Sequence, residues 1–150
     1  MRFVRFLLLI SLVPFWLAAC SGEAIPASGP IQEFSSVCDK TNDGKVIAVE
    51  GYLRFPDSFT GDQSVVLRLY QTSDFTGTPI GVTVELGSKP NQLEPVSDQY
   101  TDNDLKVHLA DGTIAPFGTK VKVSGKMYYP LVEQVFDCAL DNPYVEATAQ

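Results

Sequence analysis

Apolar and polar residues alternate along most of the chain after residue 45, which is the pattern of β-strands that bury one face. No stretch shows the 3.6-residue period of an amphipathic helix. The sequence therefore predicts an all-β domain of five or six strands, the last of which ends before Asn142-Pro143. The residues predicted to face the core are, strand by strand, Ile47, Val49, Leu53 and Phe55; Val65, Leu67 and Leu69; Val82, Val84 and Leu86; Leu105, Val107 and Leu109; Val121, Val123 and Met127; and Phe136, Cys138 and Leu140.

Turn-forming residues separate the predicted strands, and two glycines fall within them. Gly51 and Gly125 lie in phase with the core-facing positions of two long strands. A glycine on the inner face lets a long strand bend at the corner of a barrel. We therefore expect a small closed barrel, with a β-sandwich as the alternative fold. The turns are predicted at Asn42-Asp43-Gly44, Phe75-Thr76-Gly77, Ala110-Asp111-Gly112 and Phe117-Gly118.

Residues 44–147 resemble the OB-fold domains of the tRNA-anticodon-binding-like type that occur in exported bacterial proteins. The resemblance rests on Val46–Gly51, Gly118–Gly125 and Asp137–Leu140. The chain departs from the pattern twice: Ser88–Asp104 is polar and interrupted by prolines where many OB-folds have a helix, and Leu105–Leu109 adds a short strand. OB-folds bind ligands along strands two and three and through the neighbouring loops, so the resemblance implies a binding surface there.

The first twenty residues have the layout of an export signal that ends in a cysteine. Arg2 and Arg5 precede an apolar run over Phe6–Trp16, and Leu17-Ala18-Ala19 follows directly before Cys20. This segment resembles the lipobox of bacterial lipoproteins, which implies cleavage before the cysteine and acyl chains on it that anchor the protein to a membrane. A plain cleaved signal is the alternative. An uncleaved membrane helix is not expected, because the apolar segment 6–19 has 14 residues and a helix needs about 20 to cross a bilayer.

These features divide the chain into three parts. Residues 1–19 are a signal peptide, residues 20–37 are the lipidated cysteine with a flexible tether rich in Ser, Gly, Pro and Ala, and residues 38–150 are the OB-like barrel domain. The mature protein is expected in the cell envelope, outside the cytoplasm. Lipoproteins with a serine after the cysteine, as Ser21 is here, usually reach the outer membrane of a two-membrane cell; otherwise the cell surface is expected.

The mature chain is acidic. The full sequence has 11 basic and 18 acidic residues, and removal of Arg2 and Arg5 leaves 9 basic against 18 acidic residues, a net charge of −9. A domain of this charge repels phosphate backbones, and nucleic-acid binders usually carry a basic stripe. We therefore expect no nucleic-acid partner.

Two cysteines remain once Cys20 carries lipid. In an oxidising compartment Cys38 and Cys138 can form one intramolecular disulfide. It would close a loop of about 100 residues, which in the chain-entropy model stabilises a domain by up to ~4.7 kcal/mol. Because no Cys-x-x-Cys pair is present, we interpret this disulfide as structural.

Two acidic segments are candidate calcium sites. Asp39, Asp43, Gly44 and Glu50 match the first, fifth, sixth and twelfth positions of an EF-hand loop. An EF-hand needs a helix on each side, whereas the residues after Glu50 are predicted to form a strand. The second segment holds Asp98, Asp102, Asn103 and Asp104 in a long loop. We expect no resident cofactor, and calcium binding is the alternative function.

An enzyme is not expected, because groups for catalysis are scarce. His108 is the only histidine, and it shares an outward face with Lys106. No Gly-x-Ser-x-Gly or similar nucleophile motif is present. One histidine and two paired cysteines do not make a zinc site.

The remaining candidate is an outward face that carries tyrosine and arginine side chains. Such residues are common in recognition surfaces, although cross-strand tyrosine packing would explain them equally. The sequence thus indicates a membrane-anchored, non-catalytic envelope lipoprotein whose OB-like module binds a protein, a peptide or a small ligand. The candidate ligand-binding residues are Tyr52, Arg54, Arg68, Tyr70 and Tyr128.

Overall fold

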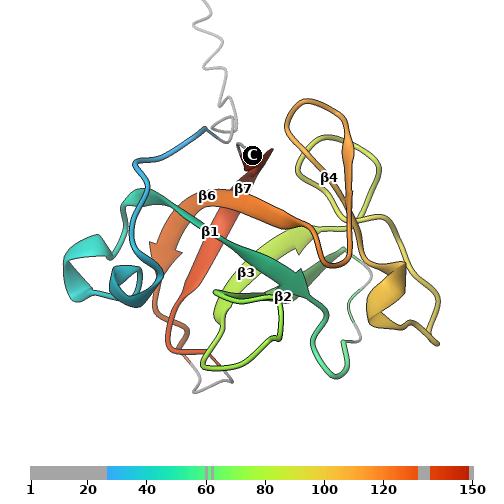
Figure 1. Cartoon of the computed structure of the whole chain (residues 1–150), viewed down its shortest axis with the longest axis horizontal. Coiled ribbons are helices and arrows are strands. Elements are labelled where there is room, and N and C mark those ends of the chain that lie inside the picture. Colours follow the sequence, from blue (N-terminus) through green and yellow to red (C-terminus); the bar gives the residue numbers. More distant parts are fainter. Residues whose placement is uncertain (1–26, 60, 62, 132–135, 149–150) are drawn as a thin grey trace, which may run out of the picture.

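The computed structural model describes residues 27–59, 61, 63–131 and 136–148. Five strands form a closed barrel in the order β1-β2-β3-β7-β6, and β4 and β5 form a separate two-stranded sheet (Figure 1). The predicted all-β, OB-like barrel is therefore confirmed, and the sandwich alternative is wrong. The elements are η1 (Phe34–Ser36), η2 (Lys40–Asn42), β1 (Val46–Arg54), β2 (Ser64–Tyr70), β3 (Ile80–Glu85), η3 (Asp102–Asp104), β4 (Lys106–His108), β5 (Ile114–Pro116), β6 (Lys120–Tyr128) and β7 (Ala139–Ala147).

Two glycines lie where the long strands turn the corners of the barrel. β1 pairs with β6 over residues 46–52 and with β2 over residues 52–54, so Gly51 lies where the partner changes. A Cβ atom on Gly51 would press against the carbonyl oxygen of Tyr70, and one on Gly125 would lie 2.9 Å from the carbonyl oxygen of Asp141. Both positions therefore require glycine, as the sequence predicts for barrel corners.

The final strand is longer than the sequence predicts. It was expected to end before Asn142-Pro143, but β7 continues to Ala147. The register between β6 and β7 shifts between Ser124 and Lys126, and Asn142 has a positive φ of 50°. A bulge leaves a residue outside the hydrogen-bond ladder, so Pro143, which has no N–H, is tolerated there.

The insertion between β3 and β6 fills an opening in the barrel wall. β3 and β7 are parallel and pair only at Gly81 with Ala139 and at Val82 with Leu140. Beyond this pair, Leu93 N donates to Glu85 O (2.9 Å), and Ala110 N donates to Val145 O (2.7 Å). Five apolar side chains of the insertion are buried in the same core as the barrel strands: Leu93, Leu105, Val107, Leu109 and Ala115. The segment where many OB-folds have a helix therefore closes the barrel in another way.

The ordered domain begins before Cys38. Residues 28–37, here called the strap, lie along β1 and β6 although the sequence assigns them to the flexible tether. Ala48 N donates to Pro30 O (2.9 Å), and Gly29 N donates to Ser124 Oγ (3.1 Å). The strap fits closely because Ala48 and Ser124 are small, and both are fully buried. Residues 20–26 of the predicted tether, including Cys20, and the predicted signal peptide (residues 1–19) lie outside the described residues.

The predicted disulfide is present. Cys38 and Cys138 are bonded, with a Cα–Cα distance of 5.5 Å. The bond joins the end of the strap to the residue before β7, so it closes a loop across 100 positions of sequence. Among the residues that the structure describes, no helix combines the length and the apolar character needed to span a bilayer.

Candidate binding groove on the outer face of the barrel

One row of residues crosses the outer face of all five barrel strands. Arg54, Arg68, Gly81, Ala139 and Tyr128 are successive Cα partners on β1, β2, β3, β7 and β6. Their neighbours along each strand point into the core, so these five point outward. The row has large polar side chains at its ends and almost no side chain in its middle.

Phe136 covers the middle of this row. A Cβ atom on Gly81 would lie 2.8–2.9 Å from three ring atoms of Phe136, so the ring rests directly on the backbone of β3. Phe136 is buried, at 8% exposure, yet it does not belong to the core cluster inside the barrel. The prediction that it shares the inward face of Cys138 and Leu140 is therefore wrong, because it precedes β7 and packs outside the barrel.

A groove of about 390 Å³ lies beside Phe136, between β2 and the loop that follows β1. Its volume is within the range of ligand sites, which is roughly 300–1,000 Å³. Its position matches the region where OB-folds bind, along strand two and the adjoining loops. The residues that line the groove are Pro56, Ser58, Phe59, Ser64, Val65, Val66, Arg68 and Phe136.

Arg68 is the charged residue among the described residues that line the groove, and it is bound to a loop carboxylate. Its Nη1 and Nη2 donate to Asp57 Oδ1 (3.0 Å) and Oδ2 (2.9 Å), so the pair is bidentate. These hydrogen bonds and the nearby positive charge lower the pKa of Asp57, and the same hydrogen bonding raises the pKa of Arg68. The Arg68 side chain is only 12% exposed, whereas that of Asp57 is 86% exposed.

Arg54 lies directly opposite Arg68 on the neighbouring strand. Two like charges in this position would repel each other. Arg54 Nε donates to Asp102 Oδ2 (2.9 Å), and its guanidinium carbon lies 5.5 Å from the ring centroid of Phe75. Each arginine thus has its own carboxylate, and only Arg68 lines the groove.

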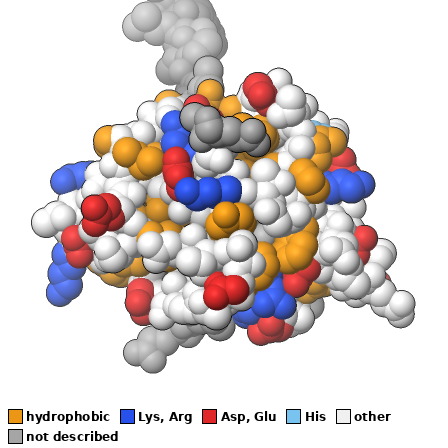
Figure 2. Space-filling view, in the orientation of Figure 1, with side chains coloured by type: hydrophobic (Ala, Val, Ile, Leu, Met, Phe, Trp, Pro, Cys, Tyr) orange, Lys and Arg blue, Asp and Glu red, His pale blue; other side chains and the backbone are white. Residues whose placement is uncertain are grey.

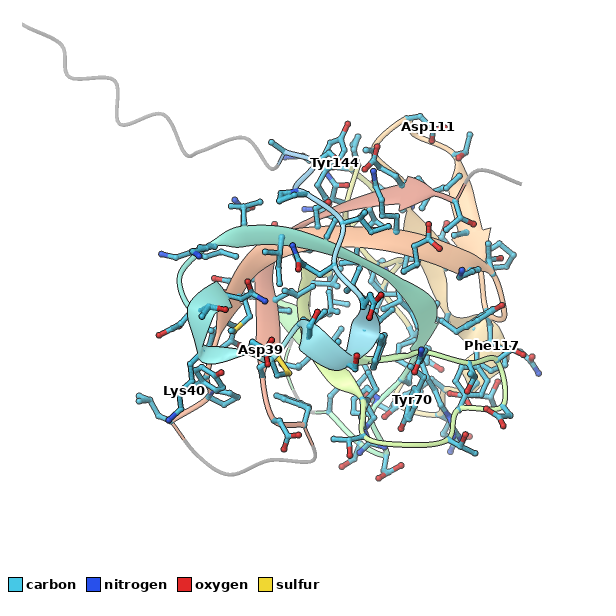
Figure 3. The ribbon with its side chains drawn as sticks, turned by 60° about the vertical axis from the view of Figure 1, so that its left-hand side comes forward. Asp39, Lys40, Tyr70, Asp111, Phe117 and Tyr144 are labelled. Atoms are coloured by element: carbon cyan, nitrogen blue, oxygen red, sulfur yellow. A yellow bond between two sulfur atoms is a disulfide. The ribbon has the colours of Figure 1, made fainter. Side chains whose placement is uncertain are left out.

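The two tyrosines next to the arginines are engaged in packing. Tyr52 and Tyr70 are cross-strand partners. Tyr70 has the predicted outward phase but is only 7% exposed, because Phe75 packs edge-on against it at 5.6 Å and Phe117 stacks on Phe75 at 5.2 Å. Figure 3 shows Tyr70 and Phe117 on the same side of the barrel. This geometry supports the packing interpretation for Tyr70.

Tyr128 lies at the far end of the row. Its hydroxyl group is 3.3 Å from Thr83 Oγ1, across β7. Neither residue lines the groove. Of the five residues proposed from the sequence, the structure therefore brings Arg68 alone into this groove.

The residues of the EF-hand-like segment do not meet. Asp39 and Asp43 flank η2, whereas Glu50 lies within β1 and its carboxylate binds Lys120 Nζ at 2.6 Å. Figure 3 places Asp39 and Lys40 well away from Tyr70 and Phe117. Over the described ranges, no group of three or more His, Cys, Asp or Glu side chains is placed to hold a metal ion.

The second acidic segment is used for local structure. Asp102 binds Arg54, and Asp104 accepts hydrogen bonds from Thr101 N (2.8 Å) and Thr101 Oγ1 (2.9 Å), which caps η3. These hydrogen bonds lower the pKa of Asp104. Asp98 is exposed.

His108 is less exposed than its predicted outward position suggests. Its side chain is 13% exposed, and Nε2 lies 3.5 Å from Glu94 Oε1. Within the described part of the chain this nitrogen is buried without a hydrogen-bond partner. Lys106 Nζ lies 3.4 Å from the other oxygen of the same carboxylate, so the three residues form one small charged cluster.

No family model, curated protein or solved structure matches this chain. The candidate site therefore rests on the geometry of this protein alone. Sequence reasoning missed Asp57, Phe59 and Val66. Val66 had a usable signal, because it is an apolar residue at an outward position of a strand whose other outward positions are polar.

Proposed function

We propose that this protein is a lipid-anchored envelope protein whose OB-like barrel binds a protein, a peptide or a small ligand, without catalysis. The observation that carries the proposal is the groove along β2, which has an apolar lining and one rigidly held arginine at the place where OB-folds bind. Apolar pockets with a few fixed polar groups are the usual form of ligand sites. The proposed binding needs no cofactor.

The anchor is proposed from the lipobox at Leu17–Cys20. Seven residues separate Cys20 from Ser28, where the strap begins, and a coil of that length has a root-mean-square reach of about 15 Å. Figure 1 shows the start of the strap (blue) and the C-terminal end of β7 toward the top of the barrel, and the loop after β1 and the start of β7 toward the bottom. The proposed arrangement therefore holds the barrel near the membrane by one end and leaves the groove end free.

The charge distribution supports a partner other than a nucleic acid. On the face shown in Figure 2, Lys and Arg side chains are scattered and often lie beside acidic ones. Together with the net charge of −9 of the mature chain (9 basic against 18 acidic residues), this arrangement gives little attraction for a phosphate backbone.

Affinity capture tests the groove. The lipidated protein would be purified from its membranes, immobilised and exposed to solubilised envelope proteins and small-molecule extracts. Val66→Glu places a charge in the apolar groove, and Lys126→Glu makes the same charge at an exposed position of β6. We expect Val66→Glu to lose the captured ligand and Lys126→Glu to keep it. Equal capture by both variants would refute the groove as the binding site.

Mass spectrometry tests the anchor. The expected product begins at Cys20 and carries acyl chains, and it fractionates with membranes. Cys20→Ser should remove both the added mass and the membrane association. An N-terminal peptide without lipid in the unmodified protein would contradict the proposed anchor.

A further inference from the structure

The groove is lined by the guanidinium group of Arg68, which is bound to the carboxylate of Asp57. Arg68 lies on β2, the strand between β1 and β3, and its side chain is 12% exposed. Asp57 belongs to the loop after β1 and is 86% exposed. Because Asp57 lies on an exposed loop position, its carboxylate can leave Arg68 when another carboxylate takes its place and makes the same two hydrogen bonds.

The Asp57 contact shows which chemistry this part of the groove accepts. Both oxygens of Asp57 are bound, at 3.0 Å and 2.9 Å, by two nitrogens of one guanidinium. Planar bidentate pairing of this kind selects carboxylates over single-point acceptors such as amides. A ligand that ends in a carboxylate would therefore reproduce the contacts that Asp57 makes.

The rest of the lining indicates the body of that ligand. Pro56, Phe59, Val66 and Phe136 are apolar, and two serines, Ser58 and Ser64, also line the groove. Apolar side chains next to hydroxyl groups suit a peptide, which presents apolar side chains together with backbone hydrogen-bonding groups. A hydrocarbon chain would make no use of the hydroxyl groups.

We propose that the groove binds the C-terminal end of an apolar peptide segment, with the terminal carboxylate on Arg68 in place of Asp57. This inference rests on the proposed function, because it names the ligand class of the same groove. Asp57 then acts as an internal competitor that occupies Arg68 until the ligand arrives. Arg54 has no such role, since its carboxylate partner is Asp102 and it does not line the groove.

The test compares two peptides that differ only at their C-terminus. Acetylated Leu-Val-Phe with a free carboxylate and the same peptide as a carboxamide would be titrated by calorimetry into the full protein in lipid nanodiscs, with empty nanodiscs as the blank. We expect the acid to bind at least about tenfold tighter than the amide, because the charged bidentate contact is lost in the amide. Hexanoate, which has the carboxylate without peptide groups, should bind more weakly than the peptide acid.

Three variants assign the effect to its residues. Asp57→Ala should strengthen binding of the acid several-fold and leave the amide unchanged, because it removes the competitor. Arg68→Gln should abolish the difference between acid and amide, and Arg54→Gln is the matched control that should keep it. Thermal unfolding checks that each variant is folded, and Asp57→Ala, at an exposed loop position, keeps the test decisive if Arg68→Gln does not fold.

Two results would overturn the inference without refuting groove binding. Equal affinity for acid and amide, with both lost in Val66→Glu, would leave the groove as a binding site but remove the carboxylate requirement. Hexanoate binding as tightly as the peptide acid would remove the peptide requirement. If neither peptide binds, the inference fails, and capture from envelope extracts decides separately whether the groove has another ligand.

Discussion

The absence of a side chain at Gly81 determines what the outer face of the barrel can hold. Because this residue has no Cβ, the ring of Phe136 lies against β3 and forms one wall of the groove. Arg68, the cross-strand partner of Gly81, then stands next to that ring as the charged residue of the groove. The row has large side chains at both ends and the small residues Gly81 and Ala139 between them, which leaves room for the Phe136 ring.

A larger residue at position 81 should disturb both stability and the groove. In Gly81→Val the Cβ would lie 2.8 Å from the Phe136 ring, so the ring must move. Overpacking of this kind costs about 1–3 kcal/mol, and we expect a decrease of that size in the free energy of unfolding measured with urea. Lys126→Val, at an exposed strand position, should change it by less than about 0.5 kcal/mol. Unchanged stability in Gly81→Val would contradict the observed packing.

The ion pair in the groove predicts how Asp57 titrates. The hydrogen bonds from Arg68 and its positive charge lower the pKa of Asp57 below the ordinary value of 3.8. The contribution of the pair to stability is therefore present at pH values above 3.8 and is lost as the pH falls through the lower pKa of the folded state. Carbon-13 NMR of the Asp57 carboxyl group should show a midpoint below 3.8 that returns toward this value in Arg68→Gln. A native midpoint at or above 3.8 would show that the pair does not persist in solution.

At the scale of the elements, the strands could be predicted but their partners could not. The two-residue period is a local property, and it identified most of the core-facing residues of the barrel strands. It missed Ile80 on β3 and Val145 on β7, and it wrongly included Phe136 in the approach to β7. The groove depends on which residues lie opposite one another, and register is not visible in a single strand. The burial of Tyr70 depends on Phe75, which takes a positive φ of 56° in the following turn.

The sequence did not predict the docking of the strap on the barrel, because its composition fits two different structures. Ser, Gly and Pro are typical of flexible linkers, and they also suit a segment that crosses closely over other strands. The end of the final strand was mispredicted for a similar reason. A proline usually terminates a strand, but a bulge between β6 and β7 accommodates Pro143. In both cases the deciding contact comes from a distant part of the chain.

Docking of the strap requires glycine at position 29. In Gly29→Val the Cβ would lie 2.8 Å from the backbone carbon of Ile47, and backbone cannot move aside as a side chain can. The strap should separate from β1, and the amide of Ala48, which donates to Pro30 O, should exchange with solvent at least about tenfold faster. Amides between β2 and β3 serve as the internal control, since they should keep their rates. Unchanged exchange at Ala48 would refute the close fit.

Loss of the disulfide should destabilise the domain. Replacement of both Cys38 and Cys138 by serine opens a loop of 100 positions and frees the end of the strap. Removal of a native disulfide from a small exported domain costs about 2–5 kcal/mol, and we expect a decrease of this size in guanidinium unfolding. The reduced native protein should behave like the double variant. Equal stability of the oxidised and reduced forms would show that the disulfide does not stabilise the domain.

At the scale of the whole molecule, the two ends of the barrel have separate tasks in the proposed function. The strap and the C-terminal end of β7 lie together, because Ser28 Oγ donates to Glu146 Oε2 at 2.8 Å. The proposed lipid anchor, Cys20, lies only eight positions before Ser28 in the sequence. The loop after β1 and the approach to β7 border the groove at the other end (Figure 1). A partner could therefore reach the groove without competing with the membrane.

Site-specific photo-cross-linking in intact cells tests whether the outer face of β2 is a binding site. A photoreactive amino acid would replace Val66 in the groove or, as the control, Lys126 on the outer face of β6. We expect a discrete cross-linked product at Val66 and none at Lys126, and we expect Arg68→Gln to weaken the Val66 product. Products of equal yield at both positions, or a product at Lys126 alone, would contradict it.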